Sequence, residues 1–189
     1  EWCRSMKVKL LVDESFADFA DSGNCLMNND MLDSYSGLYV MKDISSSCGV
    51  PGLRIGILAS SDKELIARVK ADASIWNINS IAEFYLQIHG KYAKAYNVSC
   101  SKVKEERQRF FNELCTVPYL RPVTSEAPFI MCEVKNPFTS SSLSSMLLEK
   151  GFLIKDCSLK KSMEGLQYVR IAVRSSEDND RLTAALKEI

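Results

Sequence analysis

The chain has 189 residues, of which 46% are hydrophobic, so it can bury a core in one domain or in two small ones. Its 24 basic and 24 acidic residues cancel, which leaves no net field to attract nucleic acid or an anionic membrane surface. The longest apolar runs, such as Leu10 to Val12 and Ile55 to Ala59, are far too short to span a bilayer. We therefore expect neither nucleic acid nor a membrane among the partners.

The seven cysteines are odd in number and include no Cys-x-x-Cys pair, which argues against a disulfide framework and against a zinc cluster. Free thiols in a reducing cytoplasm fit this usage better, so we expect a cytoplasmic protein without a metal site. The single histidine, His89, cannot build a multi-histidine metal site, and the chain has no Gly-x-Ser-x-Gly elbow. We interpret His89 as a residue of a helix surface or of its packing.

In the first half of the chain, continuous apolar runs alternate with polar connections. Buried strands are predicted over Lys7 to Val12, Leu38 to Met41 and Arg54 to Ala59. A helix capped by Ser61-Asp62 is predicted to run to about residue 71. Continuous apolar strands with helical crossovers favour the α/β class, with a mostly parallel sheet covered by helices.

The second half combines amphipathic helices with short strands. Helices are predicted at about 80–96, 101–114, 140–150 and 176–189, and strands at 119–123, 129–134, 152–155 and 167–173. Pro118 ends the second of these helices and Gly151 ends the third. This arrangement is typical of an α+β unit, and we predict two domains, over residues 1–95 and 96–189.

The stretch from Ile44 to Gly56 carries the candidate site chemistry. Three serines, Ser45, Ser46 and Ser47, precede a Gly-Val-Pro-Gly turn and Arg54. Serine hydroxyls, unpaired backbone N–H groups and one arginine in a tight loop are predicted to form an anion cradle. From the loop alone, an ordinary polar connection between two strands is equally favoured, because serine-rich turns are common.

Three motifs occur in the order that is typical of one enzyme family. They are Val12-Asp13-Glu14-Ser15-Phe16 at a strand end, Ser45 to Gly56 after a later strand, and Tyr168-Val169-Arg170-Ile171-Ala172-Val173 near the C-terminus. The chain thereby resembles the fold-type I pyridoxal-phosphate (PLP) enzymes, in particular class I/II aminotransferases of the histidinol-phosphate aminotransferase and threonine-phosphate decarboxylase kind. The resemblance spans essentially the whole chain. It implies part of the large PLP-binding domain over residues 1–95 and the small C-terminal α+β domain over 96–189.

The resemblance assigns roles to residues of the first two motifs. Asp13 would keep the pyridine nitrogen of PLP protonated, with Phe16 nearby. Arg54 and Ser45 would bind the cofactor phosphate. In the family, the lysine that forms the Schiff base lies eight positions before this arginine, so Ser46 stands at the lysine's place and is counted with the cofactor-binding residues.

Other positions qualify these assignments. Asp43 takes a place where the family often has a hydroxyl, and a carboxylate there would repel phosphate unless it turns away. Cys48 stands where an aromatic residue is usual, and its alternative role is a small buried filler. Lys42 is a weak substitute for the missing lysine, because it ends a strand. Arg170 would bind the substrate carboxylate through a bidentate fork; alternatively it is a strand-edge arginine paired with acidic residues of the last helix.

On this resemblance, we expect the C-terminal portion of a PLP-dependent class I/II aminotransferase-like protein that acts on amino acids or 2-oxo acids as a homodimer. Against the family pattern, the chain begins just before the Asp13 strand, so the half with the Gly-rich phosphate contact is expected to be missing. A serine cannot form an imine; we therefore expect no transamination by this chain, and PLP binding is in doubt. The alternative is a non-catalytic assembly or phosphate-ligand-binding domain that retains the fold. The sequence leaves open the amino donor and acceptor, and aminotransferase versus decarboxylase.

Overall fold

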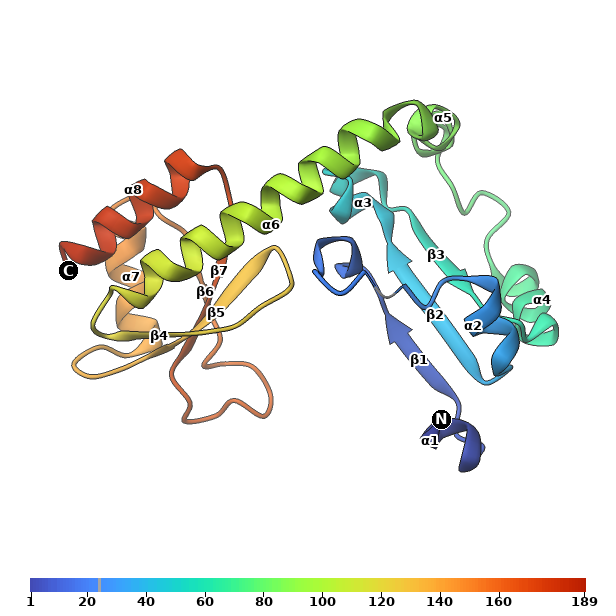
Figure 1. Cartoon of the computed structure of the whole chain (residues 1–189), viewed down its shortest axis with the longest axis horizontal. Coiled ribbons are helices and arrows are strands. Elements are labelled where there is room, and N and C mark those ends of the chain that lie inside the picture. Colours follow the sequence, from blue (N-terminus) through green and yellow to red (C-terminus); the bar gives the residue numbers. More distant parts are fainter. Residues whose placement is uncertain (24) are drawn as a thin grey trace. The chain divides into compact units, whose positions relative to one another are not determined.

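A computed structural model describes residues 1–23 and 25–189, which form two compact units (Figure 1). The first unit comprises Glu1–Asp18 and Ser22–Asn97, and the second comprises Phe19–Asp21 and Val98–Ile189. The division therefore falls within the long helix α6 (Ala93–Cys115). Each unit has its own sheet.

The first unit is built on a three-stranded sheet in the order β1-β2-β3. The elements that precede α6 are α1 (Trp2–Ser5), β1 (Leu10–Asp13), the 3-10 helix η1 (Ala17–Phe19), α2 (Asn29–Ser34), β2 (Leu38–Asp43), α3 (Ile44–Ser47), η2 (Pro51–Leu53), β3 (Gly56–Ala59), α4 (Lys63–Asp72), α5 (Ser80–His89) and η3 (Gly90–Tyr92). Strands β1 and β2 run parallel, with Asp13 opposite Met41. Strands β2 and β3 run antiparallel, with Asp43 opposite Gly56. The sheet is therefore mixed, and it places the ends of β1 and β2 side by side.

Burial in this sheet is concentrated in its central strand. Leu38, Tyr39 and Val40 of β2 are buried, because β2 has a neighbour on both sides. The prediction that the flanking strands are buried is wrong: Leu11 of β1 is 60% exposed and Ile57 of β3 is 42% exposed. These are the two edge strands, and the described residues leave their side chains largely uncovered.

In the first unit, α2, α3, α4 and α5 each begin at a residue whose side chain caps the helix. Asp62 caps α4, as predicted, by accepting a hydrogen bond from the backbone N–H of Leu65. The predicted break between helices near residue 97–100 is wrong, because α5 ends at His89 and α6 continues without interruption to Cys115. Residues 91–115 contain neither glycine nor proline, so nothing in this segment interrupts the helix. None of the helices in residues 1–23 and 25–189 has the length and apolar character needed to cross a membrane.

The second unit contains an antiparallel four-stranded sheet in the order β4-β5-β7-β6. Its remaining elements are β4 (Leu120–Val123), β5 (Phe129–Val134), α7 (Ser140–Glu149), β6 (Lys155–Asp156), β7 (Tyr168–Ala172) and α8 (Ser176–Lys187). The α+β character expected of this half is present. The strand predicted at 152–155 is displaced, since only Lys155 and Asp156 pair with β7.

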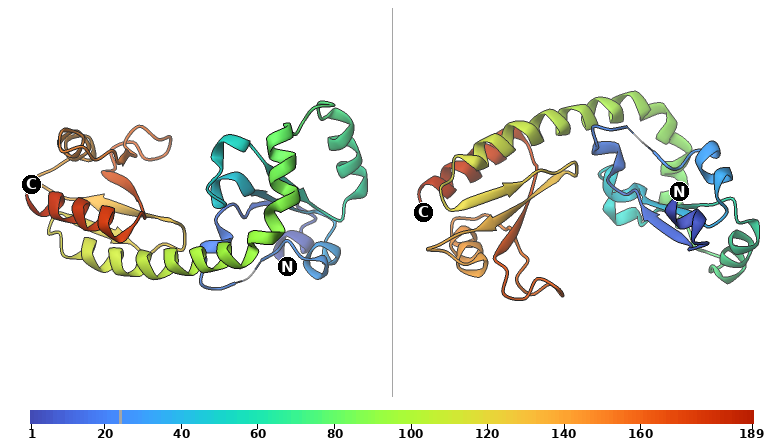
Figure 2. Two further views of the ribbon diagram at one scale, coloured as in Figure 1. Left: turned by 90° about the horizontal axis from the view of Figure 1, so that it is seen from above. Right: turned by 60° about the horizontal axis from the view of Figure 1, so that its bottom comes forward.

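The large apolar core of the chain lies in this second unit. Fully buried side chains from its helices and strands form one cluster, which includes Phe110, Leu114, Ile130, Leu143, Leu147, Val169, Ile171 and Leu186. Helix α8 runs beside α6, as Figure 2 shows from two directions. Polar contacts join the two helices: the amide of Asn179 donates to Glu106 at 2.7 Å, and Arg109 pairs with Asp180 at 2.7 Å.

The buried Arg107 of α6 explains why a short N-terminal segment belongs to the second unit. Its guanidinium donates to the carbonyl oxygens of Phe19 at 2.6 Å and Glu126 at 2.8 Å, and it pairs with Asp21 at 3.0 Å. A buried guanidinium needs such partners, because an unpaired charge in the interior is costly. These contacts hold residues 19–21 against α6.

Candidate functional site

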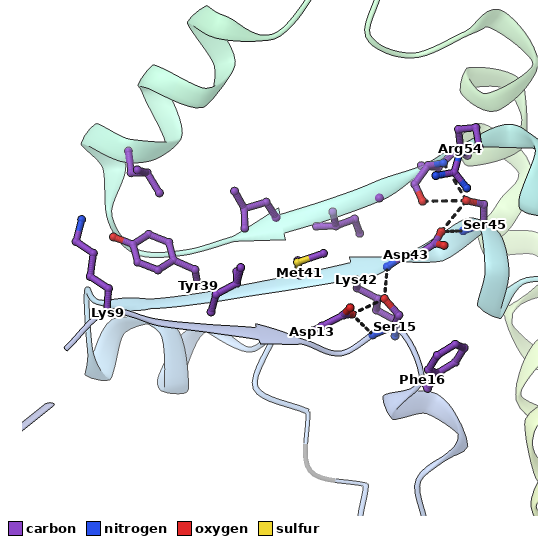
Figure 3. A pocket seen from close by; sticks show the side chains of 16 residues that line it. Lys9, Asp13, Ser15, Phe16, Tyr39, Met41, Lys42, Asp43, Ser45 and Arg54 are labelled. Atoms are coloured by element: carbon purple, nitrogen blue, oxygen red, sulfur yellow. Dashed lines mark hydrogen bonds between the residues drawn. The ribbon is translucent and has the colours of Figure 1, made fainter. Parts of the chain in front are cut away.

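One cavity of the first unit, with a volume of about 1030 Å³, lies along the sheet (Figure 3). Four residues that the sequence analysis assigned to the site line it: Asp13, Phe16, Ser45 and Arg54. Lys9 and Tyr39 lie at one end of the cavity, and Arg54 lies at the other. The structure thus brings together the residues of the first two motifs, although 41 positions separate Asp13 from Arg54 in the chain.

The other two assigned residues lie outside this lining. Ser46 is exposed on α3, and its hydroxyl donates to Asp43 Oδ2 at 2.6 Å. Arg170 belongs to β7 of the second unit, where its guanidinium lies 4.9 Å from the ring centroid of Phe129. The ion pairs formed by the described residues of α8 do not include one with Arg170, so its proposed pairing with that helix is not observed.

Ser15 connects the ends of β1 and β2 and was not assigned to the site from the sequence. Asp13 Oδ1 accepts hydrogen bonds from the Ser15 backbone N–H at 2.9 Å and from the Ser15 hydroxyl at 2.5 Å. The Ser15 hydroxyl oxygen in turn accepts from the backbone N–H of Asp43 at 3.0 Å. The Asp-x-Ser spacing is the signal that predicts such a side-chain turn. Asp13 is exposed, and among the described residues its other oxygen, Oδ2, has no hydrogen bond.

The Asp43 carboxylate accepts hydrogen bonds from the donors of the serine loop. It caps α3, with Oδ1 accepting from the backbone N–H and the hydroxyl of Ser45 at 2.9 and 2.7 Å, and from the Ser46 N–H at 3.3 Å. The hydrogen bonds from Ser45 and Ser46 lower the pKa of the Asp43 carboxyl to about 2. The prediction of unpaired N–H groups in this loop is therefore wrong. An Asp followed two and three positions later by serines is a helix-start pattern, and it was the signal for this contact.

The remaining serine contacts fix the loop to the start of β3. Ser45 is fully buried, and its hydroxyl oxygen accepts from the backbone N–H of Ile55 at 3.0 Å. The Ser47 hydroxyl donates to backbone carbonyl oxygens at 3.2 Å. Gly49 follows α3 with a φ of +74°, a conformation that glycine adopts without strain. All three hydroxyls thus serve the loop itself.

Arg54 contributes a guanidinium group to the cavity lining. It is exposed, and in the part of the chain that the structure describes it forms no ion pair. Its φ of +55° places it in the left-handed region, which is uncommon for a residue with a β-carbon. A strained residue in a cavity lining is a reason to propose a function for it.

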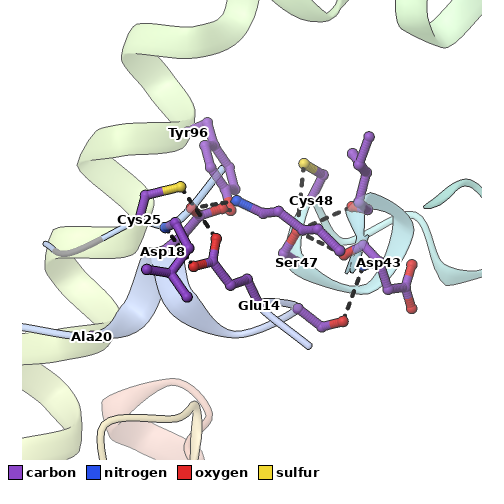
Figure 4. A network of polar contacts seen from close by, with 12 residues as sticks. Glu14, Asp18, Ala20, Cys25, Asp43, Ser47, Cys48 and Tyr96 are labelled. Carbon is purple, nitrogen blue, oxygen red and sulfur yellow. Dashed lines mark hydrogen bonds and ion pairs between the residues drawn. The ribbon is translucent and has the colours of Figure 1, made fainter. Parts of the chain in front are cut away.

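A second polar network, around Glu14, Asp18 and Tyr96 (Figure 4), includes an ion pair with Lys42 of the cavity lining. The Lys42 amine pairs with Asp18 Oδ1 at 2.6 Å, and Asp18 Oδ2 accepts from the Tyr96 hydroxyl at 2.6 Å. The buried Glu14 accepts from the Leu26 backbone N–H at 2.6 Å. Asp18 and Tyr96 are 78 positions apart, so no local pattern in the sequence predicts their contact.

Comparison with known proteins places these observations in a family. The family described as "Aminotransferase class I and II" matches residues 1–186. The chain belongs to this family. The CMP-5'-(3-aminopropyl)phosphonate synthase of Streptomyces rubellomurinus is 32% identical over 183 residues, which are 96% of this chain and 29% of that protein. The threonine-phosphate decarboxylase of Salmonella typhimurium is 27% identical over 189 residues, covering 99% of this chain and 50% of that protein.

Solved structures confirm the predicted fold class, an α/β PLP-transferase large-domain part followed by an α+β part. The histidinol-phosphate aminotransferase from Clostridium acetobutylicum matches with a TM-score of 0.86 at 27% identity, over 99% of this chain and 55% of that one. A decarboxylase from Sulfurospirillum multivorans matches with a TM-score of 0.83 at 27% identity, over 95% of this chain and 52% of that one. This chain therefore spans about half the length of these two structures.

The family implies PLP, and the residues present can be tested against it. Covalent attachment of PLP requires a lysine amine. The lysines of the cavity lining are Lys9 and Lys42; the Lys42 amine is held by Asp18, and the Lys9 amine lies 3.9 Å from Asp62. Ser46 offers only a hydroxyl. The described residues therefore do not fit covalent attachment of PLP.

Proposed function

We propose that this chain is the C-terminal portion of a class I/II aminotransferase-like protein that acts on amino acids or 2-oxo acids, and that it does not itself carry out transamination. One observation carries the second statement: position 46 presents a hydroxyl that is bonded to Asp43. A hydroxyl cannot form an imine and is a poor base at neutral pH. Lys42 is the lysine nearest to position 46 in the sequence, and its amine forms an ion pair with Asp18.

The proposal assigns residues 1–95 to the large domain and residues 96–189 to the small one. Asp13 would meet a pyridine nitrogen with the oxygen that Ser15 leaves available, and Phe16 would flank the ring. Arg54 would meet an anionic group, and Arg170 would bind a substrate carboxylate. The family's homodimeric assembly and a cytoplasmic location belong to the same proposal. Relatives with decarboxylase and aminotransferase names match almost equally, so both reaction types are kept.

A second candidate function is a non-catalytic domain that retains the fold for assembly or for binding an anionic ligand. Arg54 favours it, because an exposed guanidinium without an ion pair among the described residues is available to an anion. Asp13 favours the first proposal, because a simple anion site has no use for a carboxylate that faces a pyridine nitrogen. Reactivity toward a pyridine aldehyde separates the two.

The test compares the full chain with Ser46→Lys and with the matched control Ser46→Ala. Each protein is incubated with pyridoxal, which carries the aldehyde but no phosphate, then reduced with borohydride and mapped by peptide mass. We expect a reduced adduct at position 46 in Ser46→Lys, and none at the site in the other two proteins. An adduct on Lys42 of the unaltered chain would contradict the proposal, because a reactive amine would then be present without any substitution at position 46.

A further inference from the structure

Asp43 is placed so that its own side chain satisfies the donors at the serine loop. Two backbone N–H groups and two hydroxyls, from Ser45 and Ser46, converge on its two carboxylate oxygens at 2.6–3.3 Å. These are donors of the predicted anion cradle, and they include Ser45, which the resemblance assigns with Arg54 to the cofactor phosphate. Figure 3 shows the Asp43 carboxylate beside Ser45, at the same end of the cavity as Arg54.

The donors cannot serve a second anion while Asp43 holds them. Each N–H and each hydroxyl has one hydrogen to donate. The Ser45 hydroxyl is fully buried and also accepts from Ile55, so it cannot turn toward the cavity without breaking that contact. A phosphate would also meet the negative charge of the Asp43 carboxylate, since an aspartate is ionised at neutral pH.

The surroundings do not offset this charge. Among the described residues, neither Arg54 nor Lys42 forms an ion pair with Asp43, and Lys42 is neutralised by Asp18. Asp13, the second carboxylate of the cavity lining, is joined to the backbone of Asp43 through Ser15. Among the described lining residues at this end of the cavity, the carboxylates thus face one guanidinium that forms no ion pair, that of Arg54.

We infer that Asp43 fills the phosphate position of this site with its own carboxylate, so that the cavity excludes phosphate monoesters and admits ligands that lack a phosphate. The inference rests on the proposed placement of the family's site in this cavity. It makes Asp43 a specificity-determining residue and a second departure from a PLP site, separate from the serine at position 46.

The first experiment measures binding of inorganic phosphate to the full chain by phosphorus NMR titration. Asp43→Ser removes the carboxylate and frees the donors, and we expect it to bind phosphate at least about tenfold more tightly than the unaltered chain, the factor that a gain of charge-assisted hydrogen bonds gives. Asp62→Ser is the matched control, because Asp62 also caps a helix of this unit. It should bind no better than the unaltered chain, and adding Arg54→Ala to Asp43→Ser should reduce the gain.

Two results of this titration would overturn the inference. One is phosphate binding by the unaltered chain that equals binding by Asp43→Ser. The other is an Asp43→Ser protein with an unchanged circular dichroism spectrum and no gain in binding. Equal gains in Asp43→Ser and Asp62→Ser would also overturn it, since the effect would then follow the loss of any cap.

The second experiment covers the case in which Asp43→Ser does not fold, and it keeps Asp43 in place. Ser46→Lys is offered PLP and pyridoxal in equal amounts, and the adducts at position 46 are quantified by mass after reduction. We expect pyridoxal to react at least as readily as PLP, because the phosphate gains no donors. A preference for PLP of about tenfold or more would overturn the inference. Absence of both adducts would count instead against the proposed function, so the two failures are distinguishable.

Discussion

The two units of this chain are stabilised in different ways. In the second unit, α6, α7, α8 and the four-stranded sheet enclose one apolar cluster, whose members include the fully buried Phe110, Ile130 and Leu147. In the first unit, burial is strongest in β2, while large apolar side chains of both edge strands stay exposed. The candidate site therefore lies in the unit that has fewer buried apolar side chains.

The largest expected effect tests this difference with one substitution made in each unit. Phe110→Ala removes a fully buried ring from α6 and should lower the free energy of unfolding by about 3–5 kcal/mol. Phe84→Ala removes a ring of α5 that is 60% exposed, and it should change that energy by no more than about 0.5 kcal/mol. Urea unfolding followed by circular dichroism measures both. Similar losses in the two variants would mean that α5 is covered as completely as α6.

A smaller effect is expected for the polar network of the first unit. Asp18→Asn removes a charged partner from both Lys42 and Tyr96, and it should cost about 1.5–3 kcal/mol, as for hydrogen bonds to charged groups. The control Asp21→Asn removes a 66% exposed partner of Arg107 and should cost less than about 1 kcal/mol. Hydrogen exchange followed by mass spectrometry locates each loss. Faster exchange spread evenly over both units after Asp18→Asn would contradict a local role.

The smallest effect concerns acid. The pKa of Asp43 is lowered from 3.8 to about 2 by its hydrogen bonds with Ser45 and Ser46, so its stabilising contribution is complete above pH 3.8 and is lost as the pH falls toward 2. In the second unit the pKa of Glu106 is also lowered, and the largest cause is its hydrogen bond with Arg109. Asp43→Asn should flatten the acid-induced rise in hydrogen exchange in the first unit only, and Glu106→Gln in the second unit only. Exchange profiles between pH 4 and 2 check this, and an effect of either variant on the opposite unit would contradict it.

Much of the second unit could be predicted from local pattern. Strand β5 was predicted to the residue, and in the structure the side chains from Phe129 to Val134 alternate between partly buried and buried. The first unit was predicted less well. A continuous apolar run was interpreted as burial, yet Leu11 and Ile57 lie on edge strands. Whether a run is covered depends on the elements that pack against it, which a local pattern does not specify.

Some features of the candidate site could likewise be predicted from the sequence, and others could not. Both Asp13 and Arg54 line one cavity, as the resemblance implied when it assigned them to one cofactor. The ends of the parallel strands β1 and β2 lie at one edge of the sheet, and β3, which follows Arg54 and runs antiparallel to β2, begins at that edge. The capping role of Asp43 was accessible to sequence reasoning but was overlooked in favour of an open anion cradle. The contact between Asp18 and Tyr96 was not accessible, since it joins residues that only the complete fold brings together.

The left-handed backbone of Arg54 has a consequence for protein engineering. Arginine in this conformation costs about 1–2 kcal/mol, and glycine would adopt the same φ without that cost. A stabilisation programme that ranks variants by melting temperature would therefore select Arg54→Gly. The variant would lose the guanidinium of the cavity lining and with it the means to attract an anionic ligand. Thermal stability is thus a misleading guide at this position, and variants here should be ranked by ligand binding.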